Sequence, residues 1–172
     1  MKRIISFLFA FAIFMIAANA QIKDEFWGCK LGVTTKAQLI SRLQSQGFKC
    51  KVDKENDGFY INDVTYAGEV WEYCTFSFYK NKLQFVGFSK GGTMKKVIGI
   101  YDTILENIAR KYPQASRTMI VDEASKKNAR FDDGKVYLSI SYNIKGYGAF
   151  ATLIYMSKAL AVEINKDISN DL

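Results

Sequence analysis

The chain has 172 residues, of which 24 are Lys or Arg and 17 are Asp or Glu, so its formal net charge is +7. Hydrophobic residues make up 49% of it and aromatic residues 15%, a balance that builds a core and excludes disordered and collagen-like chains. The chain contains no histidine, which excludes Ser-His-Asp and Cys-His catalysis, His-ligated zinc and a histidine acid or base.

The first twenty residues have the pattern of a cleaved signal peptide. Lys2 and Arg3 precede an apolar run over 4–18, and Ala18-Asn19-Ala20 then supplies small residues at the −3 and −1 positions before Gln21. The run is shorter than the roughly twenty residues of a membrane anchor, and no cysteine of a lipoprotein follows it. We predict cleavage between Ala20 and Gln21, a periplasmic or secreted location and no membrane span in the mature chain.

Cleavage removes two positive charges and no negative ones, so the mature chain carries 22 − 17 = +5. Its lysines are scattered rather than clustered. This modest charge favours an acidic partner or an acidic envelope surface over nucleic acid.

The first half of the mature chain predicts one helix followed by strands. After a short extended piece at 26–32, Thr35 and Gln38 form a capping box for a helix over about 35–46, which Gly47 ends. Alternating apolar residues predict strands at 48–52, 59–66, 71–80 and 83–89. Asn81-Lys82 forms the turn of a hairpin between the last two.

Gly91-Gly92 marks a break, after which the same order of elements returns. Val97, Tyr101, Ile104 and Ile108 form one apolar stripe of a helix over about 93–111, which ends before Pro113. We predict further strands at 117–122, 128–132, 135–144 and 149–157, and a short C-terminal helix with a tail within 158–172.

These elements predict an α+β fold with an antiparallel sheet or sheets and helices on one face. No linker rich in Pro or Ser separates the halves, which cover about 26–90 and 91–172. We therefore expect one compact domain over 21–172, following the signal peptide at 1–20.

The opening Phe26-x-Gly28-x-x-x-Gly32-x-Thr34 resembles that of a family of small exported bacterial proteins of unknown function. Tyr66-Ala67-Gly68, Lys111-Tyr112-Pro113 and Thr152-Leu153-Ile154-Tyr155 agree with that family. More remotely, the doubled helix-then-sheet order resembles beta-lactamase-inhibitor-type domains and small outer-membrane assembly lipoproteins. Both groups act by protein contact, and the resemblance implies no catalytic residue.

All three cysteines, Cys29, Cys50 and Cys74, lie in the mature part. An oxidising compartment would permit one disulfide among them, with one thiol left over. Each cysteine also falls in an apolar alternation, which favours buried free thiols. The sequence leaves both alternatives open.

Four short patterns have the spacing of functional sites. Asp53-x-Glu55-x-Asp57-Gly58 imitates half of a calcium loop, but Val64 stands where the bidentate Glu belongs. Ser77-x-x-Lys80 has the spacing of a Ser-Lys pair on a segment that we predict as strand. Gly91-Gly92-Thr93 could offer N–H groups to an anion. The fourth pattern consists of Asp122-Glu123 and Asp132-Asp133, whose carboxylates could converge as in a glycosidase if their strands pair.

The strand at 70–80 carries the sequence's candidate binding site. Strict alternation places Cys74, Phe76 and Phe78 with Val70 on one face, and Trp71, Tyr73 and Tyr79 on the other. Trp and Tyr are enriched at protein interfaces, so we predict that the second face binds a partner unless loops or the C-terminal segment cover it.

Together these observations predict a non-enzymatic domain of the cell envelope that binds a protein or another ligand. The alternative is an envelope hydrolase that uses Asp/Glu carboxylates. No catalytic residue, metal site or cofactor is predicted, and the partner is a protein or envelope component of unknown identity.

Overall fold

The computed structural model describes residues 20–53, 58–146 and 148–170. These residues form an α+β fold of antiparallel strands with helices packed on the sheet, as predicted. Its helices are α1 (Lys36–Ser45), α2 (Met94–Lys111) and α3 (Lys158–Asn170). Its strands are β1 (Glu25–Phe26), β2 (Cys29–Lys30), β3 (Lys51–Asp53), β4 (Gly58–Tyr66), β5 (Glu69–Tyr79), β6 (Lys82–Gly92), β7 (Ser116–Glu123), β8 (Lys126–Asp132), β9 (Val136–Lys145) and β10 (Gly148–Ser157).

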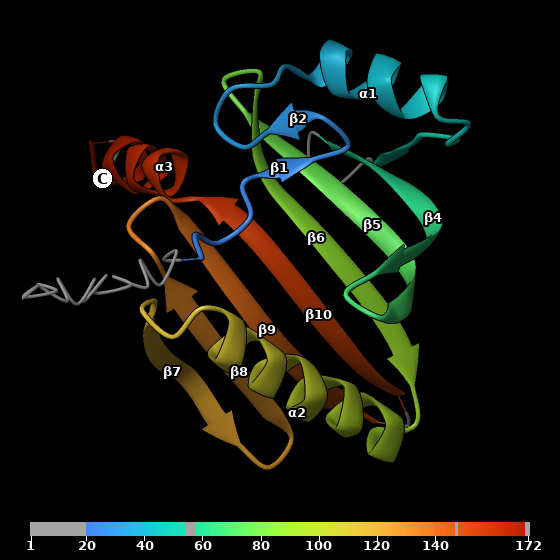
Figure 1. Cartoon of the computed structure of the whole chain (residues 1–172), viewed down its shortest axis with the longest axis vertical. Helices are drawn as coiled ribbons and strands as arrows, with labels where there is room; N and C mark the ends of the chain where they lie inside the picture. Colours follow the sequence, from blue (N-terminus) through green and yellow to red (C-terminus); the bar gives the residue numbers. More distant parts are fainter. Residues whose placement is uncertain (1–19, 54–57, 147, 171–172) are drawn as a thin grey trace, which may run out of the picture.

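One large sheet runs through both halves of the chain. Its strand order is β3-β4-β5-β6-β10-β9-β8-β7, so the last strand of each half pairs with the last strand of the other (Figure 1). A separate pair, β1 with β2, forms a small hairpin.

The predicted break at Gly91-Gly92 lies inside a strand, because β6 continues to Gly92. Gly91 pairs with Phe150 and Gly92 with Ala149. A Cβ atom on Gly91 would lie 3.2 Å from the Phe150 ring, so glycine here makes room for an aromatic side chain of the neighbouring strand. The glycines therefore belong to the strand predicted over 83–89, which extends to Gly92, two residues before α2 begins.

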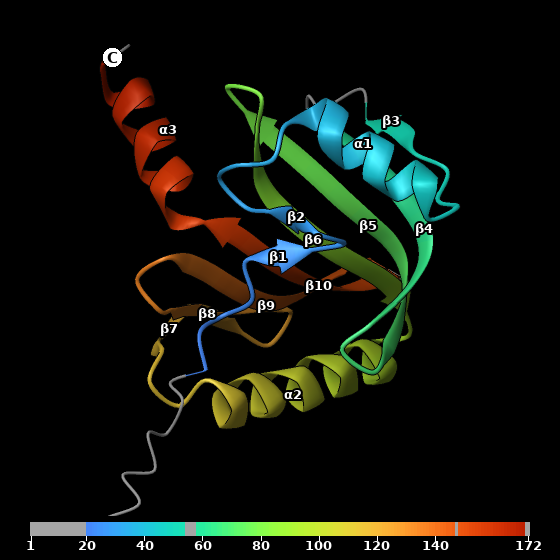
Figure 2. The same cartoon turned by 45° about the horizontal axis from the view of Figure 1, so that its top comes forward.

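The core lies on one face of the sheet, under α1, α2 and the β1–β2 hairpin (Figure 2). Both helices begin as predicted: Thr35 and Gln38 form the capping box of α1, and the Thr93 hydroxyl accepts from the Lys96 N–H at the start of α2. The stripe of α2 is buried, as the periodicity predicts. Its buried residues are Val97, Ile100, Tyr101, Ile104 and Ile108.

The β4–β5 hairpin changes face along its length. The paired residues Ile61 and Cys74 point into the core. The paired residues Val64 and Trp71 also point into the core, although each lies three positions closer to the turn along its own strand. Strict alternation would point the second pair outward. Between them Asp63 has φ +55°, a left-handed conformation that resets the alternation and curls the hairpin end toward α2 (Figure 1).

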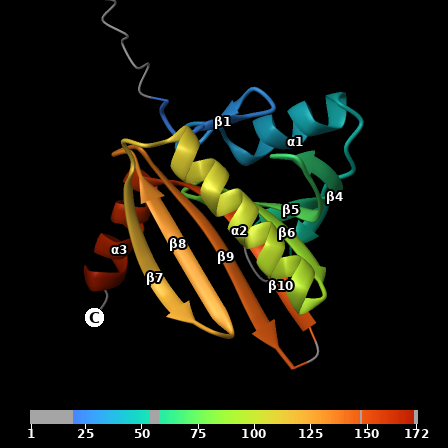
Figure 3. The same ribbon diagram turned by 60° about the horizontal axis from the view of Figure 1, so that its bottom comes forward.

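Helix α3 lies against the opposite face of the sheet, at one end (Figure 3). The Tyr79 hydroxyl donates to the Asp167 carboxylate, and Lys80 forms ion pairs with Glu163 at 2.8 Å and Asp167 at 3.0 Å. These contacts fix α3 to the β5–β6 turn. Within the described ranges, no helix is long and apolar enough to cross a membrane.

Candidate functional site

The sheet face opposite α1 and α2 is the candidate site, and we call it the open face. It is defined by two cross-strand rows that the strand register aligns and by Phe150 of β10, which points to the same side beside them. The first row consists of Asn62, Tyr73, Ser89, Thr152, Ser141 and Asn128; the second consists of Tyr60, Thr75, Gly87, Ile154, Ser139 and Arg130. Short hydroxyl and amide side chains dominate the first row, the second row is mixed, and no member of either row is acidic.

Tyr73 lies on the open face, as predicted, and its side chain is 44% exposed. Its ring meets the ring of Tyr60 edge to face, with centroids 5.9 Å apart. Lys51 lies over the other ring of this pair, 5.8 Å from the Tyr60 centroid. Tyrosines held by neighbouring rings present a rigid, amphipathic contact area to a partner.

Tyr79 lies on the same side of the sheet but does not contribute an open surface. Its hydroxyl donates to Asp167 of α3, and this hydrogen bond raises the pKa of Tyr79 above its usual value. The C-terminal helix α3 therefore binds the Tyr79 side chain. For Tyr79, the alternative that the C-terminal segment covers the predicted binding face applies.

The placement of Trp71 on the binding face was wrong. Trp71 is fully buried, its ring centroid lies 6.0 Å from that of Phe88, and its Nε1–H donates to the Tyr66 carbonyl at 2.9 Å. The positive φ of Asp63 and the resulting curl turn this end of β5 over, so Trp71 belongs to the core.

Phe150 is an open-face residue that the sequence reasoning missed. It is 53% exposed, and its ring lies over Gly91 of β6. The alternation of β10 carries the signal: Ala149, Ala151 and Leu153 are buried, which leaves Phe150 pointing to the other side.

Three polar side-chain atoms on the open face are buried without a hydrogen-bond partner. They are Oδ1 of Asn62, Oδ1 of Asn128 and Nε of Arg130. The two asparagines stand at the two ends of the first row, and Arg130 stands beside Asn128 in the second. An unpaired buried polar group lowers the stability of the fold by about 1–3 kcal/mol, so these three groups are polar atoms of this face whose hydrogen bonding is incomplete.

The two carboxylate pairs do not converge, although their strands β7 and β8 pair. Asp122 pairs with Lys127, whereas Asp132 lies five residues further along β8, roughly 17 Å away along the strand. Glycoside hydrolysis needs carboxylates about 5–9.5 Å apart. Asp122-Glu123 and Asp132-Asp133 therefore stand at opposite ends of the β7–β8 hairpin.

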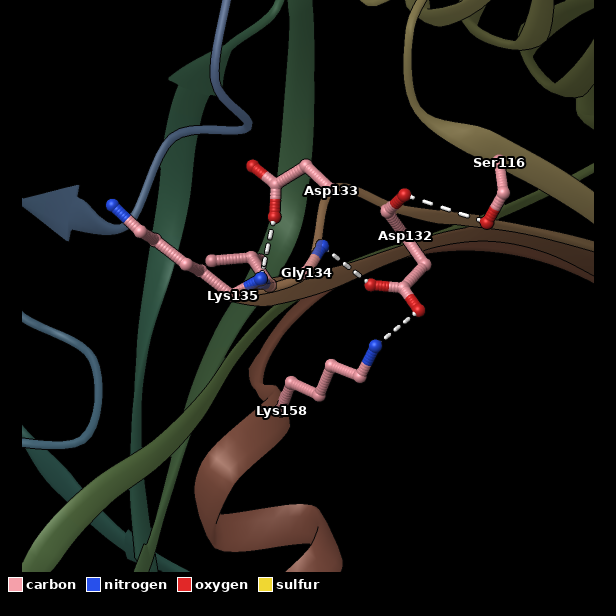
Figure 4. Close-up of polar contacts among 7 residues, drawn as sticks. Ser116, Asp132, Asp133, Gly134, Lys135 and Lys158 are labelled. Carbon is pink, nitrogen blue, oxygen red and sulfur yellow. Dashed lines mark hydrogen bonds and ion pairs between the residues drawn. The ribbon is translucent and has the colours of Figure 1, made fainter.

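Asp132 and Asp133 instead organise the β8–β9 turn (Figure 4). Asp132 Oδ1 accepts from the Gly134 N–H at 2.7 Å, and its Oδ2 lies 2.6 Å from Lys158 Nζ. Asp133 accepts from the N–H of Lys135 and, at 2.7 Å, from that of Ile22. Burial raises the pKa of Asp132, but the hydrogen bonds from Lys158 and Gly134 together outweigh burial. The pKa of Asp132 therefore lies below its usual value. All of these contacts are structural.

The Ser77-Lys80 spacing does not bring its two side chains together. The Ser77 hydroxyl donates to Gln84 Oε1 at 3.4 Å, while the Lys80 ammonium pairs with the carboxylates of α3.

The polar groups of the predicted anion-binding pattern, Gly91-Gly92-Thr93, form hydrogen bonds within the protein. The Gly91 N–H donates to the Glu72 carboxylate at 3.2 Å, and the Thr93 hydroxyl caps α2. A carboxylate thus occupies the place where an anion would bind.

Most of the calcium-like pattern lies outside the described residues, because 54–57 are not among them. Val64, at the position of its last ligand, is buried in the core. Among the described residues no group of His, Cys, Asp or Glu is arranged to hold a metal ion.

The three cysteines are free thiols. Cys29 and Cys74 are buried and Cys50 is half-buried. Burial raises the pKa of each thiol, most strongly that of Cys74, which disfavours the reactive thiolate.

Comparison of the chain with protein-family models, with curated proteins and with solved structures found no match. The family resemblance inferred from the sequence therefore stays a prediction.

Proposed function

We propose that this chain is an exported, non-enzymatic protein of the cell envelope that binds a partner protein through the open face. The observation that carries the proposal is the open face itself. It spans strands of both halves, it lies opposite the core helices, and it carries two exposed aromatic rings, Tyr73 and Phe150.

The chemistry of the open face indicates the kind of partner. Its two rows offer hydroxyls, amides and the guanidinium of Arg130, and neither row contains a carboxylate. The carboxylate of Glu72 lies beside Phe150, where it accepts a hydrogen bond from the Gly91 N–H. Such a face complements a protein surface rich in acidic groups and hydrogen-bond acceptors. The mature net charge of +5 that the sequence predicts (22 − 17) acts in the same direction, because it attracts an acidic partner from a distance.

Export rests on the N-terminal pattern of the sequence. The first described residues, Ala20 and Gln21, are exposed, and the Ile22 N–H is already bound to Asp133. Cleavage after Ala20 would leave this anchored segment intact. The intact mass of the exported protein tests the assignment, and a mass that retains residues 1–20 would contradict it.

Photo-crosslinking tests the open face directly. We would place p-benzoylphenylalanine at Tyr73, at Phe150 and, as a control, at Val33, which is 64% exposed in the segment between β2 and α1. We expect Tyr73 and Phe150 to crosslink to the same envelope protein and Val33 to give no such product.

A charge reversal provides the matched test of specificity. Arg130→Glu should abolish both crosslinks, whereas Lys95→Glu on the exposed start of α2 should leave them unchanged. An equal product at Val33, or a product formed only with a second copy of this chain, would contradict the proposal.

A further inference from the structure

A small cleft lies on the inner side of the sheet, away from the open face. Tyr66 and Ala67 of the β4–β5 turn form one wall, the C-terminal half of α2 forms another, and Leu153 and Tyr155 of β10 form the floor. The curl of the hairpin creates the cleft, because it carries this turn over to α2 (Figure 2).

The volume of the cleft is about 140 Å³. A cavity of about 150 Å³ accommodates one benzene ring, so the space suits a single ring. Ile104, Ile108 and Leu153 give it aliphatic walls, and Tyr66, Tyr112 and Tyr155 give it aromatic ones. Apolar walls with a few polar groups are typical of small-molecule sites.

The polar groups around the cleft are donors. The Asn107 Oδ1 accepts from Arg110 at 2.8 Å, so the remaining polar group of this lining side chain is its amide N–H₂, a donor. Lys111 also lines the cleft, and its ammonium lies 5.4 Å from the centre of the Tyr112 ring. The rings of Tyr66 and Tyr155 meet edge to face with centroids 5.9 Å apart, and a tyrosine hydroxyl is also able to donate.

A cationic ligand does not fit this cleft. Both faces of the Tyr66 ring are occupied: Phe88 stacks on it with centroids 4.3 Å apart, and the Lys23 ammonium lies 5.2 Å from its centre. Burial raises the pKa of Tyr66 to about 12, so its hydroxyl stays neutral at physiological pH. The residues that line the cleft include no carboxylate.

We propose that this cleft binds a small carboxylate that carries one aromatic ring. The ring lies between the aliphatic side chains of α2 and the tyrosines, and the carboxylate accepts hydrogen bonds from Lys111 and Asn107 at the rim. Arg110 and Lys111 in the last turn of α2 place two positive charges at the negative end of the helix, and these charges attract the carboxylate against the helix dipole. The site is independent of the proposed function, because none of its residues belongs to the open face.

Titration of the whole purified protein with phenylacetate tests this site. We expect saturable chemical-shift changes at the backbone amides of Ala67, Ile108 and Tyr112, and much weaker changes with benzylamine, which has the same ring and the opposite charge. Lys111→Met should weaken phenylacetate binding about tenfold, the loss expected for one charge-assisted hydrogen bond.

Two further variants complete the test. Asn107 is exposed, so Asn107→Trp should block the rim without unfolding the protein, and binding should disappear. Lys95→Met removes an equal charge from the other end of α2 and should leave binding unchanged. The proposal is overturned if phenylacetate causes no saturable change, if benzylamine binds equally well, or if Lys111→Met binds like the original chain.

Discussion

Truncation of Trp71 tests the curl of the β4–β5 hairpin, since the fold buries this ring completely while the neighbouring Tyr73 stays 44% exposed. Emptying a buried Trp site costs about 3–5 kcal/mol, of which the Nε1–H bond to the Tyr66 carbonyl accounts for roughly 0.5–1.5 kcal/mol. Tyr73→Ala removes only an edge contact with Tyr60, about 0.5–1.5 kcal/mol. Each kcal/mol shifts the melting temperature by about 2–4 °C in a domain of this length.

Urea denaturation followed by far-UV circular dichroism measures both variants against the original chain. Trp71→Phe joins the series, because it keeps a ring in the core, loses only the indole hydrogen bond and part of the volume, and folds more readily than the alanine variant. We expect stability to decrease in the order original, Tyr73→Ala close to Trp71→Phe, then Trp71→Ala. Equal losses for Trp71→Ala and Tyr73→Ala would refute the inward placement of Trp71.

Three more predictions follow from the core, the β8–β9 turn and the thiols. Ile104→Ala should lower the free energy of unfolding by about 2–5 kcal/mol, and an unchanged urea midpoint would show that α2 is not a main packing partner of the sheet. The pKa of Asp132 is lowered in the folded state, so its contribution to folding stability is present above the unfolded pKa and is lost as pH falls through the folded pKa. Asp132→Asn should therefore lose less stability than the original chain when the pH falls below about 4. Melting temperatures at a series of pH values measure this difference. Ellman's reagent should modify Cys50 first in the native protein, and in Cys50→Ser all modification should wait for unfolding.

The sequence predicted the elements whose signals are local. The capping box of Thr35 and Gln38 and the apolar stripe that includes Ile104 depend on spacings within one helix, and both are present as predicted. The fold class followed from the order of these elements.

Other features depend on contacts that no local pattern contains. Asp63 adopts a positive φ, and this single conformation moved Trp71 from the predicted surface into the core. The break predicted at Gly91 lies inside β6, because the Phe150 ring that fills the space beside this glycine comes from a strand 59 residues later (150 − 91). The C-terminal segment had mixed signals, and its position as α3 over Tyr79 depends on Asp167 and Lys80.

The pairing of β6 with β10 determines which strand edges the molecule exposes. Each half is a four-stranded meander whose last strand would be an open edge on its own, with ten or eleven residues of unpaired backbone. In the whole chain β6 and β10 pair with each other, so neither strand is an edge. The outer strands of the sheet are β3, which has three residues, and β7, whose register with β8 shifts between Met119 and Val121. A half produced alone would therefore be prone to aggregate, whereas two halves mixed in solution have complementary edges and should reassemble into the full sheet.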